Sequence, residues 1–178
     1  MEIYLVRHTE TVCEKGICYG QSDVDIAPPF EMIFENIVSQ LPSEALIFTS
    51  PLKRCVTLAK YIQAKTKAIS YEEDERLMEM NFGDWELKNW NEIPPEQLNP
   101  WMEDFVNIKV QNGESFAVLH ERVGDFITAL ISKKIKSPIV ITAHAGVIRS
   151  ILCHQTSLPL KDAFQNKVDF GQVIKIEL

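Results

Sequence analysis

Short apolar segments rich in β-branched residues alternate along this sequence with segments of helical periodicity. Strands that alternate with helices predict a layered fold, here a three-layer α/β/α arrangement around a mostly parallel central sheet. The chain has 178 residues, of which 46% are hydrophobic, and can bury one full core, so we expect a single domain over residues 1–178. The expected strands are residues 3–6, 46–49, 68–71, 139–142 and 173–178, and the expected helices are residues 31–40, 52–65 and 115–132.

One long segment, from about residue 76 to residue 113, departs from this alternation. It contains all three tryptophans, and two proline breaks interrupt regular structure within it. We predict an excursion that contains short helices and in which Phe82, Trp85 and Trp90 pack. Long excursions are often functional, so we expect this one to lie over the active site.

The charge balance argues against several classes of partner. A formal net charge of -7 and a pI near 5.1 disfavour nucleic acid and anionic membrane surfaces, because both favour excess Lys and Arg. No apolar stretch approaches the roughly 20 residues that span a bilayer, and the N-terminus has no signal-peptide pattern. Cys13, Cys18, Cys55 and Cys153 form no C-x-x-C pair, which indicates neither a zinc site nor a disulfide framework. We therefore expect a cytoplasmic protein, and the oligomeric state stays open.

Histidine and arginine residues gather where the expected strands end. Arg7 and His8 follow the first strand, and His144 follows the fourth. The small residues Ala145 and Gly146 then allow a tight turn into a helix. The carboxyl ends of parallel strands meet at one edge of a sheet, where ligands bind in open α/β folds. We therefore expect His8 and His144 to lie at the same edge.

Arg54 follows the second strand. Ser50 is a favourable N-cap and Pro51 suits the first helical position, so Arg54 is expected in the first turn of the helix, near the same edge. Taken singly, a histidine at a strand end is commonly structural, and an arginine in a first helical turn is commonly a solvated charge. Two of each at one edge of an acidic protein are better explained by a pocket for a small anion.

These side chains suit phosphate chemistry. The planar fork of arginine donates two parallel, charge-assisted hydrogen bonds to two phosphate oxygens. A neutral imidazole is nucleophilic, and its unperturbed pKa of about 6.5 leaves that form available near neutral pH. Histidine can then form a covalent intermediate that divides one difficult transfer into two easier steps.

Four separated blocks resemble the motifs of the histidine phosphatase superfamily, also called the phosphoglycerate mutase-like family. Their order and spacing cover nearly the whole chain, which makes the resemblance more specific than any one block alone. The blocks are Leu5-Val6-Arg7-His8-Thr9-Glu10; Ser50-Pro51-Leu52-Lys53-Arg54-Cys55 followed by Thr57-Leu58-Ala59; Leu77-Met78-Glu79-Met80-Asn81-Phe82-Gly83-Asp84-Trp85-Glu86; and Ala143-His144-Ala145-Gly146-Val147-Ile148-Arg149.

The resemblance implies a metal-independent phosphatase that needs no cofactor and acts on a small phosphorylated substrate. It implies His8 as the nucleophile that becomes phosphorylated, and Glu79 as the proton donor and then the proton acceptor. Arg7, Arg54 and His144 are implied as the phosphate pocket. Fixed positive donors stabilise the charge that spreads over the equatorial oxygens of the transition state, so these three side chains can supply what a metal otherwise supplies.

Within the superfamily, three loop segments resemble those of the α-ribazole phosphatases of cobalamin biosynthesis. They are residues 16–24, 82–86 and 112–116. The implied reaction is hydrolysis of α-ribazole 5'-phosphate to α-ribazole and phosphate.

We also expect particular roles for residues in and near these loops. Glu14 stands where the mutases of the superfamily tend to have an asparagine that contacts the phosphoryl group. A carboxylate there repels phosphate and is expected to face a sugar hydroxyl, which weakens the mutase interpretation. Gln21 and Tyr19 are expected to contact a ribose or a base, with turn packing as the alternative for Tyr19. Glu86 is the competitor of Glu79 for the acid role.

Three other functions stay open. A broad phosphatase of phosphosugars, nucleotides or phosphoserine could have the same sequence features. A phosphoglycerate mutase needs a lid that keeps water from the phosphohistidine, and this chain is short for one. A phosphate-binding protein without turnover predicts loss of the nucleophile or the acid, yet both His8 and Glu79 are present.

Overall fold

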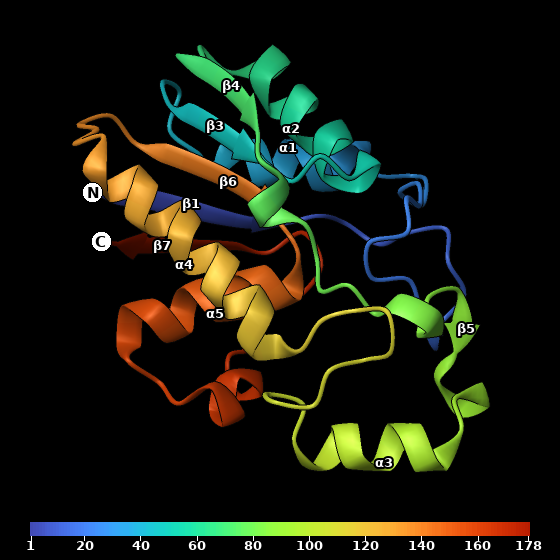
Figure 1. Ribbon diagram of the computed structural model, residues 1–178. Helices are drawn as coiled ribbons and strands as arrows, with labels where there is room; N and C mark the ends of the chain where they lie inside the picture. Colours follow the sequence, from blue (N-terminus) through green and yellow to red (C-terminus); the bar gives the residue numbers. More distant parts are fainter.

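Five strands of this chain pair into the main sheet. The computed structural model describes residues 1–178 and gives the strand order β4-β3-β6-β1-β7 (Figure 1). Neighbouring strands run parallel except for β7, which pairs antiparallel with β1 at the edge. The strands are β1 (Glu2–Arg7), β3 (Leu46–Thr49), β4 (Ser70–Glu73), β6 (Ile139–Ala143) and β7 (Val173–Glu177).

Helices cover both faces of this sheet, because successive strand residues point to opposite sides and both sides are apolar. Val6 and Ile47 belong to a core with two helices, α1 and α2, whereas Leu5 and Ile141 belong to a core with α4 and α5 on the opposite face. The predicted three-layer α/β/α fold with a mostly parallel sheet is confirmed. The helices are α1 (Glu31–Ser39), α2 (Lys53–Lys65), α4 (Phe116–Ser132) and α5 (Ala145–Thr156).

The predicted start of α2 is wrong. The helix begins at Lys53, and Leu52 at the N-cap is extended, so Ser50 is not the N-cap and Pro51 is not the first helical residue. The backbone N–H of Lys53 instead donates to Oδ1 of Asp23 at 2.8 Å. An aspartate from a distant loop therefore caps the helix, and its charge suits the positive end of the helix dipole. Arg54 still lies in the first turn, as expected.

The third predicted strand is displaced by two residues. Residues 68–71 were expected from their apolar character, whereas β4 covers Ser70–Glu73. This strand lies at the edge of the sheet, where three of its four side chains are exposed and polar residues are tolerated. Its sequence therefore lacks the apolar signal that marks the interior strands.

The excursion predicted between residues 76 and 113 lies beside the main sheet, where Figure 1 shows α3 and β5. Its β5 (Lys88–Asn89) pairs antiparallel with β2 (Ile17–Cys18), and its one α-helix is α3 (Pro95–Glu103). Phe82, Trp85 and Trp90 pack edge to face with one another or with Trp101, with ring centroids 5.5 to 6.1 Å apart. Three short 3-10 helices lie at its start or within it, namely η1 (Glu75–Leu77), η2 (Gly83–Trp85) and η3 (Trp90–Glu92); a fourth, η4 (Leu160–Gln165), lies outside it.

None of the helices combines the length and the apolar character needed to cross a membrane. All four cysteines are free thiols.

Candidate active site

A cavity of about 170 Å³ lies where β1 ends. Arg7, His8 and Glu79 share it, although Glu79 is far from the other two in the sequence. Arg54 and His144 do not line this cavity; both are fully buried, and the His144 ring lies 5.1 Å from the His8 ring between centroids. The remaining lining residues are Ile17, Cys18, Tyr19, Gly20, Phe82 and Trp90.

His8 is held in one tautomer. Its Nδ1 lies 2.7 Å from the carbonyl oxygen of Thr9, and a carbonyl can only accept, so Nδ1 carries the proton. The other nitrogen, Nε2, has no protein partner and keeps its lone pair. Burial, assisted by the positive charge of Arg54, lowers the pKa of His8 to about 3. His8 is therefore neutral near pH 7, which is the form that a nucleophile requires.

Arg54 joins the ends of two strands to the loop around Gly20. Its Nε donates to Nδ1 of His144 at 3.3 Å, and its Nη1 and Nη2 donate to the carbonyl oxygens of Ser22 and Gly20 at 2.8 and 2.5 Å. Each terminal nitrogen carries two hydrogens, so one N–H on each is left for an anion. A fully buried cation with two free donors is suited to holding phosphate oxygens.

Both ring nitrogens of His144 are engaged. Because Nδ1 accepts from Arg54, the proton of the neutral ring is on Nε2, which donates to Oγ of Ser50 at 2.8 Å. Burial and the charge of Arg54 hold the pKa of His144 well below its usual value. In this arrangement His144 supports Arg54 and is uncharged, whereas the sequence predicted it as a source of positive charge.

Arg7 is fixed from the C-terminal part of the chain. Its Nη1 donates to the carbonyl oxygen of Val168 at 2.7 Å, and its guanidinium lies 3.6 Å above the centre of the Phe170 ring. The Nε–H of Arg7 is buried without a protein partner. An unpaired buried donor costs free energy, and an anion in the cavity can satisfy it.

Glu79 is held through its carboxylate and its backbone. Oε1 accepts from the N–H of Met80 at 2.9 Å, and Oε2 accepts from the N–H of Gly146 at 3.2 Å. The side chain of Gln21 donates to the carbonyl oxygen of Glu79 at 2.9 Å. Gln21, predicted as a substrate contact, therefore contacts the backbone of Glu79 and does not line the cavity.

Glu86, the predicted competitor for the acid role, serves as an acceptor for the loop around residue 21. Its carboxylate accepts from the N–H groups of Gln21, Ser22 and Phe82 and from the hydroxyl of Ser22, at 2.5 to 3.1 Å. Gly20 has φ +38°, and a Cβ there would lie within 3 Å of the Glu86 carboxylate, so this close approach requires glycine. The geometry thus favours the structural interpretation of Glu86.

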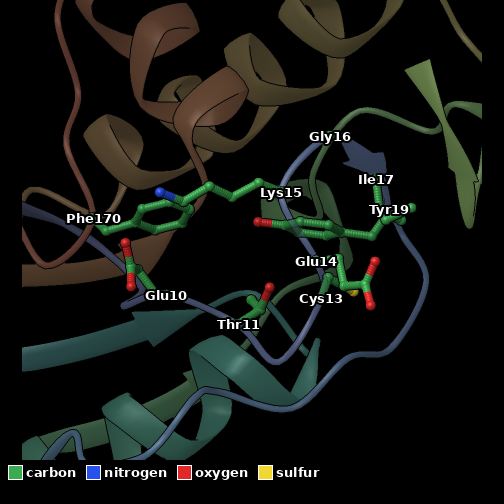
Figure 2. A pocket seen from close by; sticks show the side chains of 9 residues that line it. All are labelled: Glu10, Thr11, Cys13, Glu14, Lys15, Gly16, Ile17, Tyr19 and Phe170. Carbon is green, nitrogen blue, oxygen red and sulfur yellow. The ribbon is translucent and has the colours of Figure 1, made fainter. Parts of the chain in front are cut away.

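A larger cavity, of about 300 Å³, adjoins the first one through Ile17 and Tyr19. Figure 2 shows the rings of Tyr19 and Phe170 on opposite sides of it, with Glu14 on the Tyr19 side. Glu14, predicted to face a sugar hydroxyl, lies in this adjoining cavity and outside the one that contains His8.

A third cavity, of about 110 Å³, is also lined by Glu79. Glu79 and Phe82 line both this cavity and the one that contains His8. Five of the ten residues in its wall are aromatic, and Arg149, 4.7 Å from the ring centre of Phe164, adds a guanidinium. The aromatic lining residues are Phe82, Trp101, Phe105, Phe116 and Phe164.

Several residues of the site were not identified from the sequence. Phe170 lies in none of the four motif blocks, and the sequence predicts only a helix-capping role for Ser50. Glu114 lies in the loop segment 112–116, for which the sequence predicts no residue roles, although its carboxylate accepts from Arg122, which binds the backbone of Glu79. No group of three or more His, Cys, Asp or Glu side chains is placed to hold a metal ion.

Comparison with known proteins gives a family for this arrangement. A model of the histidine phosphatase superfamily, branch 1, matches residues 3–178. Phosphoserine phosphatase 1 of Hydrogenobacter thermophilus is 27% identical over 159 residues, covering 86% of this chain and 75% of that protein. The adenosylcobalamin/alpha-ribazole phosphatase of Escherichia coli is 24% identical over 177 residues, covering 96% and 87% of the two chains.

A solved structure has the same fold. The crystal structure of the alpha-ribazole phosphatase from Shigella flexneri matches with a TM-score of 0.90 and 25% identity, over 100% of this chain and 91% of that one.

Proposed function

Because this chain belongs to the histidine phosphatase superfamily, we propose that it hydrolyses a small phosphomonoester through a phosphohistidine at His8. The observation that carries this proposal is the fixed tautomer of His8, in which Nδ1–H is bound to Thr9 and the lone pair of Nε2 is free. A buried, neutral imidazole beside two arginines can attack phosphorus without first losing a proton.

In the first step, Nε2 of His8 forms a bond to phosphorus while the bond from phosphorus to the leaving oxygen breaks. Glu79 gives a proton to that oxygen, which leaves as an alcohol. In the second step, water attacks phosphorus, the phosphorus–nitrogen bond breaks, and Glu79 takes a proton from the water. The location of Glu79 in the same cavity as His8 supports this double role.

Arg7 and Arg54 supply the positive charge for the transferred group. The unpaired Nε–H of Arg7 is one proposed donor for the equatorial oxygens, and the two free N–H groups of Arg54, which lies near His8 but does not line the cavity, are the other two. His144 holds Arg54 in place through the hydrogen bond to Nε. On this proposal the reaction requires no metal ion.

The proposed substrate is α-ribazole 5'-phosphate. The leaving oxygen must lie next to the acid, and Glu79 also lines the third cavity, whose five aromatic rings suit the flat base of α-ribazole. The excursion contributes three of those rings, which supports its proposed location over the active site. The relatives named alpha-ribazole phosphatases support the same substrate.

Phosphoserine is the second candidate. The guanidinium of Arg149 lines the aromatic cavity and can pair with the carboxylate of phosphoserine. The relative named phosphoserine phosphatase 1 supports this choice.

A rate comparison separates the two substrates. We expect kcat/KM for α-ribazole 5'-phosphate to exceed that for phosphoserine, phosphoglycerates and nucleoside monophosphates by at least about tenfold, or about 1.4 kcal/mol in transition-state binding. Trp101→Ala should reduce the rate with α-ribazole 5'-phosphate, and Arg149→Gln should reduce the rate with phosphoserine alone. A preference below tenfold contradicts the α-ribazole assignment and favours the broad phosphatase.

The chemistry itself is tested separately. Wild-type protein given p-nitrophenyl phosphate with EDTA should release nitrophenol, and a brief exposure to labelled phosphomonoester should leave an acid-labile, base-stable label. His8→Ala should lose that label. Retention of the label by His8→Ala, or loss of activity in EDTA, contradicts the metal-independent phosphohistidine mechanism.

A further inference from the structure

The segment that carries Glu79 lies outside the main sheet. It runs between the short helices η1, which ends at Leu77, and η2, which begins at Gly83. Its backbone carbonyl groups therefore need partners from elsewhere. Two of them, on Met78 and Glu79, accept hydrogen bonds from one guanidinium, which also binds the carbonyl of Arg76 in η1.

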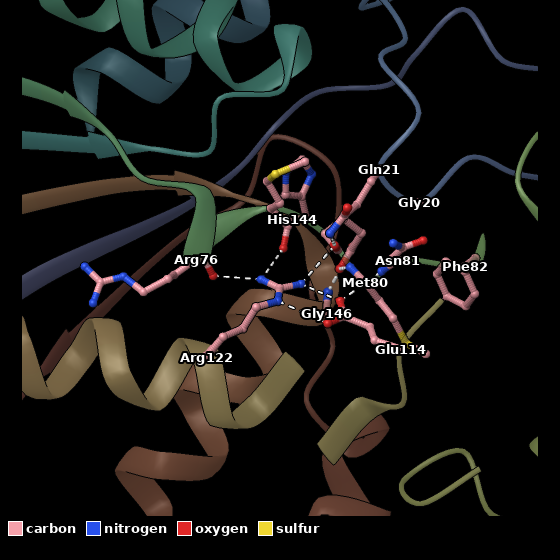
Figure 3. A network of polar contacts seen from close by, with 12 residues as sticks. Gly20, Gln21, Arg76, Met80, Asn81, Phe82, Glu114, Arg122, His144 and Gly146 are labelled. Atoms are coloured by element: carbon pink, nitrogen blue, oxygen red, sulfur yellow. Dashed lines mark hydrogen bonds and ion pairs between the residues drawn. The ribbon is translucent and has the colours of Figure 1, made fainter. Parts of the chain in front are cut away.

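That guanidinium belongs to Arg122, on α4. Its Nη1 donates to the carbonyl oxygens of Arg76 and Met78 at 2.8 and 2.7 Å, and its Nη2 donates to that of Glu79 at 3.0 Å. Figure 3 shows the guanidinium at the centre of these contacts. One side chain thus fixes the backbone at Arg76, Met78 and Glu79.

Glu114 fixes Arg122 in turn. Its two carboxylate oxygens accept from Nη2 and Nε of Arg122 at 2.6 and 3.2 Å, in a fork-to-fork pair (Figure 3). Glu114 is 8% exposed, and the side chain of Arg122 is 20% exposed. Glu114 also accepts from the N–H of Asn81, and its own N–H donates to the Asn81 carbonyl, both at 2.9 Å. The ion pair therefore holds the segment on both sides of Glu79.

We propose that Arg122 and Glu114 are positioning residues that set the place of the Glu79 carboxylate relative to His8. The inference rests on the acid role of Glu79 in the proposed function. A misplacement of about 1 Å in a reacting group can cost roughly 100-fold in rate, so a rigid support for the acid has a direct kinetic value. Neither Arg122 nor Glu114 lines the cavity that contains His8, so their effect passes through Glu79.

A merely structural ion pair and a positioning pair differ in how they affect different leaving groups. An alkoxide is a poor leaving group and needs the proton from Glu79, whereas nitrophenolate leaves without one. Displacing Glu79 therefore slows phosphorylation of His8 by an alkyl phosphate and leaves phosphorylation by p-nitrophenyl phosphate nearly unchanged. General loosening of the protein slows both.

The experiment measures the first turnover by rapid quench into base, with labelled p-nitrophenyl phosphate and a labelled alkyl phosphate. Arg122→Lys keeps the charge and loses the fork, and Glu114→Gln keeps the size and loses the charge. We expect each variant to phosphorylate His8 about 10-fold to 100-fold more slowly from the alkyl ester. The rate with p-nitrophenyl phosphate and the Kd for inorganic phosphate should both stay close to their wild-type values.

Lys65→Gln is the control. Lys65 on α2 pairs with Glu35 on α1 at 2.9 Å, and neither residue lines a cavity described above or contacts the segment that carries Glu79. This variant should keep the wild-type ratio of the His8 phosphorylation rate with the alkyl ester to the rate with p-nitrophenyl phosphate. Equal losses with both esters, or an unchanged ratio in Arg122→Lys and Glu114→Gln, would overturn the inference.

The test separates the inference from its premise. Glu79→Gln should reduce the ratio of the alkyl-ester rate to the p-nitrophenyl phosphate rate at least as far as Arg122→Lys does. An unchanged ratio in Glu79→Gln overturns the acid assignment, and absence of labelled wild-type protein overturns the proposed phosphatase mechanism.

Discussion

Replacing Gly146 by alanine adds one methyl group next to the carboxylate proposed to carry the proton. A Cβ at this position would lie 2.3 Å from Oε1 of Glu79, whereas ordinary contact begins near 3.4 Å. The carboxylate must therefore move by about 1 Å, which is enough to cost roughly 100-fold in rate, or about 2.7 kcal/mol. The Glu79 side chain is flexible at that end, so it can move without unfolding the protein.

The same substitution should lower stability only moderately, so that the protein stays folded. Gly146 lies in the first turn of α5, where alanine is favoured over glycine by up to about 1 kcal/mol. The displaced carboxylate loses its hydrogen bond from the Gly146 N–H, worth about 1.5 to 3 kcal/mol for a charged acceptor. We expect these effects to offset one another partly and to leave a loss of about 2 kcal/mol or less.

The assay compares kcat for an alkyl phosphate with the midpoint of urea unfolding for the same protein. Gly124→Ala is the matched control, because its new Cβ would lie 2.9 Å from the His154 ring on α5, away from the cavities described above. The control should keep wild-type kcat. Wild-type kcat in Gly146→Ala, with the protein folded, would refute the placement of Glu79 as the acid.

Three further predictions follow from the contacts of the site. Burial lowers the pKa of His8 to about 3, below the value of about 6.5 expected in an unfolded chain, so NMR should detect no protonation of His8 between pH 8 and pH 5. Because the unfolded chain binds this proton more readily, the contribution of neutral His8 to the free energy of unfolding is fully present above about pH 6.5 and is lost as the pH falls toward 3. Titration of His8 near pH 6.5 would contradict this prediction. Ser50→Ala leaves the buried Nε2–H of His144 with only a weak acceptor, Sγ of Cys55 at 3.5 Å, and should cost about 1 to 3 kcal/mol in urea unfolding; a change below about 0.5 kcal/mol is the contrary result. Glu86→Gln should speed amide exchange at Gln21 and Ser22 and reduce turnover much less than Glu79→Gln does; equal losses of turnover return the acid role to Glu86.

The strand ends were predictable because apolar runs fix the sheet and its carboxyl edge. That reasoning brought His8, Arg54 and His144 into one region without any knowledge of side-chain contacts. It failed at Ser50, since local capping preference is a weak signal and the hydroxyl instead accepts from His144, which follows another strand.

Other contacts were beyond sequence reasoning because they join residues far apart in the chain. The bond from Arg122 to the Glu79 carbonyl spans 43 positions, and the bond from Arg7 to Val168 spans 161. No local periodicity predicts such pairs. Likewise, the sequence placed Gln21 in the correct loop, but only the fold shows that its amide contacts backbone.

The sheet order has a consequence for the synthesis of this protein. β1 carries Arg7 and His8 at its end, and it lies between β6 and β7. A ribosome makes β1 early and both of its neighbours late, so the nucleophile strand stays without partners while most of the chain emerges. The phosphate site is therefore completed only after β7 has been made, and until then an apolar strand with two unpaired edges is exposed to chaperones and to aggregation.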